Sequence, residues 1–535
     1  MRSYLSPGVA HKPVGSFAVG CVTALGFGSA YLQLFFLPSV PLTPWGDQVM
    51  WLQDGIRILG GRLPYRDYFQ LTTPGSDLFY ALAVHLWGAR AWIPNLTMVF
   101  LAAGVALCMT LISRRVLSGV TATLPALLFL GFTLPSSLYA THHWFSTLGI
   151  LAAMLVLLDE INLSRATAAG VLCGLAGCFT QTKAAIAAVA LLSYFLLRRP
   201  SLQPKRGVWR EFAAFCAGFT VVLAIVNAYF IRAAGLAHFL FWTIVFPIRY
   251  FSAAKPFNTI RVYGNGFGSG IGLLHAAGFL FVHALVPLIY VIIFIQIFRG
   301  RITAEIRNAT LLIGLGGFAM FLSIAPAPSP LRIFTVSPPV FILLVIWAYE
   351  NRIVKTLTVA AATAALCVSV LAPIRFQTAW HAILDTPSGR IAFNERDRLE
   401  EFQWVLARTH PGEAFFGSPP VCFALGLNNP TALNFTTPDD FTRPSQVADV
   451  VQDLERTRVP LMLLQPGGYL PGPDDHATDH MGPFREFLFN NYELERRFAT
   501  GDEAWTRRDN APEGNAAASV FLNHKDGASS HPRTR

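Results

Sequence analysis

Long apolar windows with almost no charged residues are the feature that most constrains this chain. Stretches of roughly twenty apolar residues match the length of helix that crosses a hydrocarbon core about 30 Å thick at 1.5 Å per residue. Lipid offers no hydrogen-bond partners, so such windows must be helical. They lie near 16–37, 94–112, 119–138, 145–158, 165–180, 184–197, 212–231, 271–297, 308–325, 333–349 and 356–373. The pattern predicts an all-α polytopic membrane protein with about eleven transmembrane helices.

Composition and charge support this fold class. Only 13% of residues are charged and 53% are hydrophobic, whereas soluble domains carry about 25% charged residues. The net charge of +10 would suggest nucleic acid in a soluble protein, but many of the basic residues lie in short connections between apolar windows. These residues are Arg114, Arg115, Arg198, Arg199, Lys205, Arg206, Arg210, Arg299, Arg301, Arg307, Arg352 and Lys355. Cytoplasmic loops are enriched in lysine and arginine, so we predict membrane lipids and no nucleic acid as partners.

The same charges set the expected topology. With the N-terminus in the cytoplasm and the first apolar window retained as a span, every basic loop falls on the cytoplasmic face of an inner (plasma) membrane. Three segments then face outward: a first loop at about 38–93, a loop at about 232–270, and the tail after about 374.

The first outward loop has two helical patterns. Val49, Leu52, Ile56 and Leu59 recur at helical spacing, with Asp47 and Asp54 on the opposite face. A second helix is expected from Ser76 to Trp87, because Pro74 precedes it and Gly88 follows it. Amphipathic helices between spans commonly lie on the membrane surface with the apolar side down. We therefore expect the carboxylates of the first helix to point up into a cavity.

The tail has the composition of a soluble domain. Helical stretches alternate there with short strand-like runs. The helices are expected at Glu395 to Arg408, Ser445 to Arg458 and Phe484 to Arg497, and the strands at Ala414 to Gly417 and Pro460 to Leu464. The predicted domains are a transmembrane domain at 1–375, a small C-terminal extracytoplasmic α/β domain at 376–513, and a polar, loosely ordered end at 514–535.

The first loop also carries a recognisable motif. It reads TPWGDQVMWLQDGIRILGGRLPYRDYFQLTTPGSDLFYAL, in which an acidic residue after the first span is followed by a G-x-x-P-Y-x-D element and a proline-led helix. These features are Asp47, Gly61 to Asp67, and Pro74. A second partial motif is Phe179-Thr180-Gln181-Thr182-Lys183 at the outward end of a span. The chain thereby resembles the C-type glycosyltransferase superfamily, which includes protein O-mannosyltransferases, aminoarabinose transferases and Rgt-like bacterial enzymes.

The resemblance implies a function and a catalytic residue. Members use a polyprenyl-phosphate sugar as donor and transfer the sugar to a glycan, lipid or protein acceptor at the extracytoplasmic face of the membrane. It assigns the role of general base to Asp47. Departure from the bacterial pattern at Leu71-Thr72-Thr73-Pro74 leaves the subfamily open.

The expected chemistry asks for the same kinds of residue. A carboxylate must take the proton of the acceptor, which contributes about 10²–10⁴ in rate, and cations must stabilise the departing phosphate. The candidate phosphate ligands are Lys183, Arg249, Lys255 and Arg261, with Arg332 a weaker choice. Asp54, Asp67, Tyr65 and Arg66 of the first loop complete the predicted substrate-binding set.

Structural roles compete with these assignments. Asp47 stands at a helix start, where aspartate is a favoured cap. Asp54 and Asp67 have arginines nearby, Arg57 and Arg66, and Lys183 can reach the membrane interface as a snorkelling lysine. His142 and His143 form no evident metal site, because adjacent histidines diverge and a third ligand is not apparent. No metal site and no cofactor are predicted, and a role for a divalent metal is left open.

Two other functions stay open. A transporter or flippase for lipid-linked sugars would place ionisable residues near the bilayer midplane and often show inverted repeats. A polysaccharide polymerase or ligase of related architecture would place its key residues in a larger late loop. The acids of this chain instead gather in the first outward loop, which favours the transferase.

Overall fold

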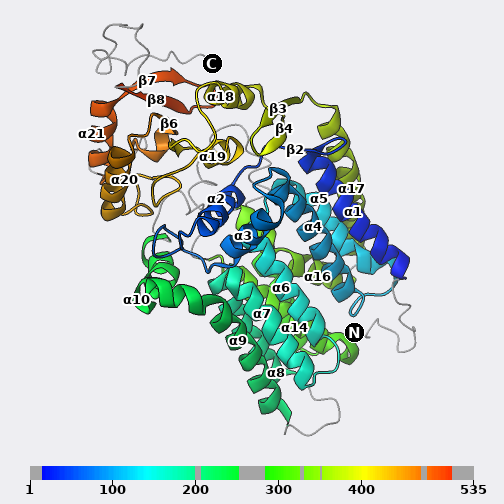
Figure 1. The fold of residues 1–535 in the computed structure, drawn as a ribbon. Coiled ribbons are helices and arrows are strands. Elements are labelled where there is room, and N and C mark those ends of the chain that lie inside the picture. Colours follow the sequence, from blue (N-terminus) through cyan, green and yellow to red (C-terminus); the bar gives the residue numbers. More distant parts are fainter. Residues whose placement is uncertain are drawn as a thin grey trace, which may run out of the picture.

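The computed structural model describes residues 15–198, 207–251, 284–325, 330–349, 352–471 and 479–508. A bundle of apolar helices makes up one end of the molecule and a mixed α/β region lies at the other (Figure 1). The first-loop helices α2 (Asp47–Leu59) and α3 (Gly75–Trp87) lie between them.

Each predicted apolar window contains helix in its described part. The helices are α1 (Ser16–Leu34), α4 (Trp92–Ser113), α5 (Leu124–Phe132), α6 (His142–Leu157), α7 (Leu163–Phe179), α8 (Gln181–Leu197), α9 (Val208–Ala234), α13 (Val286–Phe298), α14 (Ala304–Leu322), α15 (Pro330–Val336), α16 (Pro338–Ala348) and α17 (Arg352–Thr378). Within the described residues, six helical segments are long and apolar enough to cross a membrane, and the others are shorter. The total of about eleven spans therefore stays a prediction.

Small residues let neighbouring helices of the bundle approach closely. A Cβ added to Gly170 of α7 would lie 2.1 Å from the backbone oxygen of Phe215 in α9, and one added to Gly218 of α9 would lie 2.6 Å from the oxygen of Thr167. Helix packing in membranes commonly depends on such small residues, because lipid supplies no hydrophobic force between helices.

The helices of the first loop differ from the expectation in what they cover. Val49 and Leu52 of α2 are fully buried, but they pack in one apolar cluster with Phe402 and Phe415 of the C-terminal region. The apolar side of α2 is therefore covered largely by protein, and the prediction that it rests on the membrane is wrong for these residues. The helix itself, with Ile56 and Leu59 exposed, begins and ends close to where the sequence predicts.

The C-terminal region contains a four-stranded sheet in the order β5-β6-β8-β7. Its strands are β5 (Phe415–Gly417), β6 (Leu461–Leu464), β7 (Tyr492–Arg497) and β8 (Glu503–Arg507). The β5–β6 pair is parallel and the other pairs are antiparallel. The sheet is accompanied by α18 (Arg396–Leu406), α19 (Pro419–Ala424), α20 (Pro444–Thr457) and α21 (Gly482–Asn491), and preceded by the hairpin β3 (Ala382–Thr386) and β4 (Gly389–Phe393).

One element of this region was predicted wrongly. The helix expected at Phe484 to Arg497 ends at Asn491, and the last residues form β7. Tyr492 is fully buried, and its pairing with Arg507 begins the β7–β8 ladder. Tertiary pairing therefore overrides the helical preference of the Glu-Leu-Glu-Arg run. The limits of the predicted domains stay a prediction.

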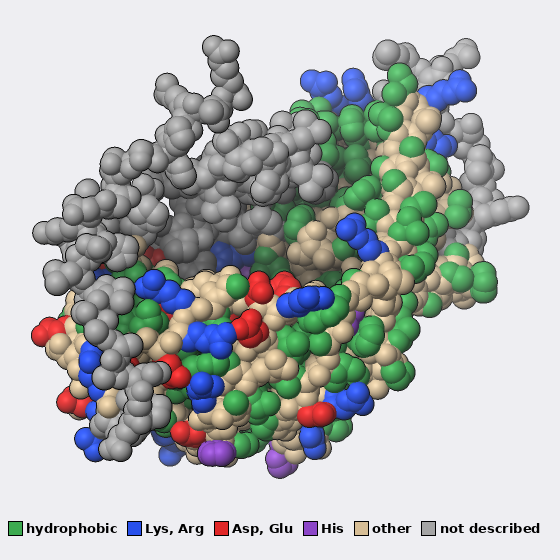
Figure 2. Space-filling model, turned by 90° about the horizontal axis from the view of Figure 1, so that it is seen from above, with side chains coloured by type: hydrophobic (Ala, Val, Ile, Leu, Met, Phe, Trp, Pro, Cys, Tyr) green, Lys and Arg blue, Asp and Glu red, His purple; other side chains and the backbone are tan. Residues whose placement is uncertain are grey.

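The C-terminal region is joined to the first loop by hydrogen bonds. The backbone N–H of Thr43 donates to the oxygen of Ala392 in β4 (3.0 Å), and Gln53 of α2 donates to the oxygen of Pro419 (3.3 Å). Seen from this end, acidic and basic side chains are interspersed over part of the surface, whereas hydrophobic side chains dominate the helices beside it (Figure 2).

Candidate active site

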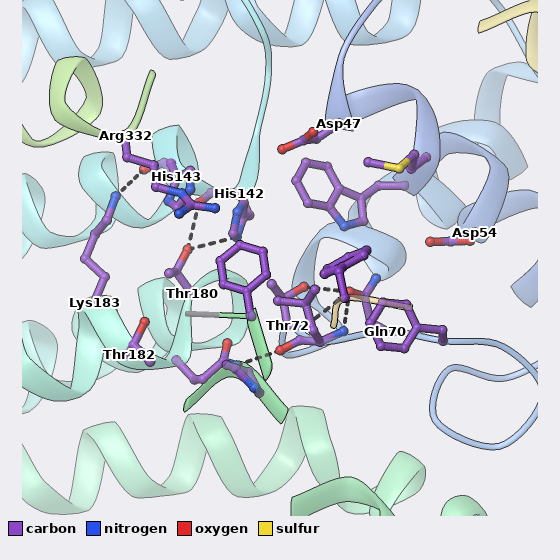
Figure 3. A pocket seen from close by; sticks show the side chains of 18 of the residues that line it. Asp47, Asp54, Gln70, Thr72, His142, His143, Thr180, Thr182, Lys183 and Arg332 are labelled. Atoms are coloured by element: carbon purple, nitrogen blue, oxygen red, sulfur yellow. Dashed lines mark hydrogen bonds between the residues drawn. The ribbon is translucent and has the colours of Figure 1, made fainter. Parts of the chain in front are cut away.

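A cavity of about 490 Å³ lies where the first loop, the helical bundle and the C-terminal region meet. Its wall combines α2, the segment Phe69–Thr72 and the starts of α6 and α8. Ser323, Ile324, Arg332, Leu433, Asn434, Phe435 and Phe441 also line it. It contains both acidic and basic groups, together with several aromatic rings. Figure 3 shows the arrangement of these side chains.

Asp47 lines this cavity from the first turn of α2. The N-cap is Gly46, whose φ of +79° favours glycine, and no side chain caps the helix. The competing role of Asp47 as a cap is therefore absent. Burial raises the pKa of the Asp47 carboxyl, and the positive charge of Arg332 opposes this rise.

Two cationic side chains lie across the cavity from α2 (Figure 3). Arg332 comes from α15 and is close enough to Asp47 for their charges to interact. Lys183 comes from the first turn of α8 and is only 1% exposed. Its Nζ donates to the backbone oxygen of His143 (3.0 Å) and to Oγ1 of Thr147 (3.2 Å). Both acceptors are neutral groups, and neither is a carboxylate.

Gln181 explains how the Phe179–Lys183 motif shapes the cavity. Its Nε2 donates to the backbone oxygens of Leu71 (2.9 Å) and Thr243 (2.8 Å), and its Oε1 accepts from the N–H of Thr73 (3.3 Å). One side chain thus holds the segment after the G-x-x-P-Y-x-D element against the helical bundle.

Asp54 lines the cavity two turns after Asp47 on α2. Its Oδ1 accepts from Nη1 of Arg57 (3.0 Å), which confirms the expected pairing. It also accepts from Nδ2 of Asn434 (3.3 Å), a residue of the C-terminal region. Burial raises the pKa of Asp54 to about 6, with Arg57 and Asn434 opposing the rise. Asp54 is therefore a buried carboxyl paired with Arg57.

Asp77 of α3 is a second buried carboxyl that the sequence analysis did not single out. Its Oδ1 accepts from Nε2 of Gln70 (2.9 Å), and the Oε1 of Gln70 in turn accepts from the hydroxyl and N–H of Thr72. Burial, and then the charge of Asp54, raise the pKa of Asp77 well above its ordinary value. Both effects disfavour the ionised form of Asp77. Its position two residues after the helix start gave no signal beyond an ordinary first-turn acid.

The other predicted residues of the first loop do not line the cavity. Asp67 accepts from the N–H of Leu63 (2.7 Å) and pairs with Arg66 (2.6 Å), which lowers the pKa of Asp67. Tyr65 is buried against Phe239, and its hydroxyl donates to the oxygen of Thr72. These contacts shape the loop; a role of Asp67, Tyr65 and Arg66 in substrate binding stays a prediction.

The predicted cations of the second outward loop have different outcomes. Arg249 is exposed, stacks over Tyr250 and does not line the cavity. Lys255 and Arg261 lie outside the described residues. Arg332, the weaker choice from sequence, is the arginine that lines the cavity.

The histidine pair His142 and His143 lies in the cavity wall. His142 contacts Thr180 and the oxygen of Phe179 through Nδ1 (both 3.3 Å), and its ring packs against Trp51. Among the described residues, no group of three or more histidine, cysteine, aspartate or glutamate side chains could hold a metal ion.

The fold can be compared with solved structures. ArnT from Cupriavidus metallidurans bound to undecaprenyl phosphate matches with a TM-score of 0.54 and 13% identity, over 92% of this chain and 97% of the other. The chain has the C-type glycosyltransferase fold. The Archaeoglobus fulgidus oligosaccharyltransferase matches with a TM-score of 0.43 and 12% identity over 84% of this chain and 68% of that chain, and the mycobacterial arabinofuranosyltransferase AftD with 0.48 and 13% over 92% and 42%. No protein-family model and no curated sequence matches the chain.

Proposed function

We propose that this protein with the C-type glycosyltransferase fold transfers a sugar from a polyprenyl-phosphate donor to an acceptor hydroxyl at the extracytoplasmic membrane surface. The observation that carries the proposal is that the Asp47 carboxyl, which does not cap α2, lines the same cavity as Arg332 and Lys183. A base and its opposing cations are the two groups that the reaction requires. The likeness to ArnT, whose structure holds undecaprenyl phosphate, supports a lipid-phosphate donor.

In this reaction Asp47 accepts the proton of the acceptor hydroxyl. The acceptor oxygen then bonds to the anomeric carbon while the bond from that carbon to the phosphate oxygen breaks, and the polyprenyl phosphate leaves with the bonding electrons. Arg332 and Lys183 stabilise the charge on the departing phosphate. A single displacement inverts the anomeric carbon.

The raised pKa of Asp47 suits this role. A base works best when its pKa lies near the operating pH, and burial moves the Asp47 carboxyl upward from its ordinary value. Arg332 limits this rise, which keeps the carboxylate available as a proton acceptor.

Replacement of the base tests the proposal. In membrane vesicles supplied with the native lipid-linked donor, Asp47→Asn should lower sugar transfer by about 10²–10⁴ while the protein level is unchanged. Asp385→Asn is the matched control, since Asp385 lies in the β3–β4 hairpin with 90% of its side chain exposed. Normal transfer by Asp47→Asn would remove the base assignment.

A further inference from the structure

The cavity has a second polar end, away from the Asp47–Arg332 pair. Asp54 of α2 and Asn434 of the C-terminal region meet there through a hydrogen bond. Figure 3 shows Asp54, Gln70 and Thr72 at this end. Asp54 and Asn434 are 380 residues apart in the sequence. The C-terminal region therefore contributes directly to the wall of the candidate active site.

The segment that carries Asn434 is fixed from the first loop. Arg57 and Arg62 both donate to the backbone oxygen of Thr431 (3.2 and 3.3 Å), and the N–H of Phe69 donates to the oxygen of Ala432 (3.0 Å). These contacts place Asn434 against Asp54.

The C-terminal region fixes the same segment from the other side. Asn429 donates to the oxygen of Leu433 (2.9 Å), and Thr436 donates to the oxygen of Gly468 (2.9 Å). Asn434 is thus held between two anchored stretches, as a preorganised binding group requires.

Asn434 has hydrogen-bonding capacity left over. Its Nδ2 makes one long bond, 3.3 Å, to Asp54, and its Oδ1 is buried without a hydrogen-bond partner in the described part of the chain. A buried acceptor left unpaired costs about 1–3 kcal/mol. Asn434 lines the cavity, so rotation of its amide can bring this oxygen to a ligand that carries hydroxyl groups.

We propose that Asn434 and Asp54 bind two hydroxyl groups of the transferred sugar, so that the C-terminal region selects the donor. This inference rests on the proposed function. The amide oxygen of Asn434 and the carboxylate of Asp54 accept hydrogen bonds, and hydroxyl groups donate them. Phe435 and Phe441 beside Asn434 present apolar surface to the ring carbons. A sugar carboxylate in this part of the cavity would lie beside Asp54, so we expect an uncharged ring rather than a uronic acid.

Deoxy donors test the inference. The parent sugar is the one that disappears from envelope glycans when Asp47→Asn replaces the wild-type protein. Full-length protein in liposomes is then given a short-chain polyprenyl phosphate that carries this sugar, or one of its single-deoxy analogues. Asn434→Ala should lower kcat/KM for the parent sugar about 10–100-fold. For the deoxy analogue that lacks the hydroxyl group bound by Asn434, the variant and the wild-type protein should have the same kcat/KM, because neither complex then contains that hydrogen bond.

Three results distinguish the two proposals. If no sugar disappears with Asp47→Asn, the proposed function fails. If Asp47→Asn is inactive but Asn434→Ala equals wild type, or loses the same factor on the parent and every deoxy analogue, only the inference about Asn434 is overturned. Asn434→Ser serves if the alanine variant does not fold. Asn490→Ala is the matched control, because Asn490 is exposed on α21 of the same region.

Discussion

Asp47 owes its availability to the glycine before it. Aspartate at a helix start normally accepts hydrogen bonds from the first N–H groups, but Gly46 takes the cap position with a φ of +79°, and the Asp47 carboxyl lines the cavity. The sequence pattern Trp-Gly-Asp predicts a helix start at this point, and α2 begins there. It could not show the burial of the carboxyl or the proximity of Arg332, because both depend on segments far apart in the chain.

A pH profile tests the pairing of Asp47 with Arg332. An ordinary carboxyl has a pKa of about 4. Because burial raises the pKa of Asp47, kcat/KM should fall with decreasing pH around a midpoint above that ordinary value. Arg332→Gln removes the charge that lowers this pKa, so the fall should begin at higher pH. Arg390→Gln, at an exposed position in the β3–β4 hairpin, should leave the profile unchanged.

Asp54 provides the necessary check on that profile. Its own pKa of about 6 lies in the same range. The acidic fall must persist in Asp54→Asn; if it vanishes there, the titrating group is Asp54 and the assignment to Asp47 is refuted.

Asp77 should behave as a neutral hydrogen-bonding group. Asp77→Asn keeps an acceptor for Gln70, so stability and transfer should stay close to wild type. Asp77→Leu leaves the amide of Gln70 unpaired and should cost about 1–3 kcal/mol of unfolding free energy. Thermal unfolding in detergent measures both. An Asp77→Asn variant as damaged as Asp77→Leu would show that Asp77 acts as a carboxylate.

At the scale of elements, α2 is positioned by close contact with α3. A Cβ added to Gly55 would lie 2.7 Å from the backbone nitrogen of Ala81. Both helices could be predicted, because apolar periodicity and the flanking Pro74 and Gly88 mark them. What covers them could not, since an apolar stripe packs equally well on lipid or on protein.

Gly55→Ala should therefore move α2 away from α3. We expect a loss of about 1–3 kcal/mol in stability and a drop in transfer, because Asp47 and Asp54 move with the helix. Thermal unfolding and vesicle transfer measure the two effects. Gly28→Ala is the control, since an added Cβ there meets nothing within 4 Å; equal behaviour of the two variants would contradict the close packing.

At the scale of the whole molecule, the helices of the bundle could be predicted from the apolar windows of the sequence, whereas only part of the C-terminal sheet could be predicted. The short strands β5 and β6 were predicted, but β7 and β8 depend on each other for pairing. A strand without its partner resembles a helix in a charged run such as Tyr492–Arg497.

Topology gives a prediction at this scale. In a variant with the exposed Cys21 and Cys367 replaced by serine, Asn490→Cys should react with a membrane-impermeant maleimide on intact cells. Glu305→Cys, at the start of α14, should react only after permeabilisation. The reverse pattern would invert the predicted orientation.

The cover of α2 has a consequence for biogenesis. Val49 and Leu52 leave the ribosome hundreds of residues before Phe402 and Phe415, their apolar neighbours. The apolar side of α2 therefore stays without these neighbours until the C-terminal region has been synthesised, after the helices of the bundle. A nonsense mutation just after α17 would remove Asn434, Phe435 and Phe441, and with them one wall of the candidate active site.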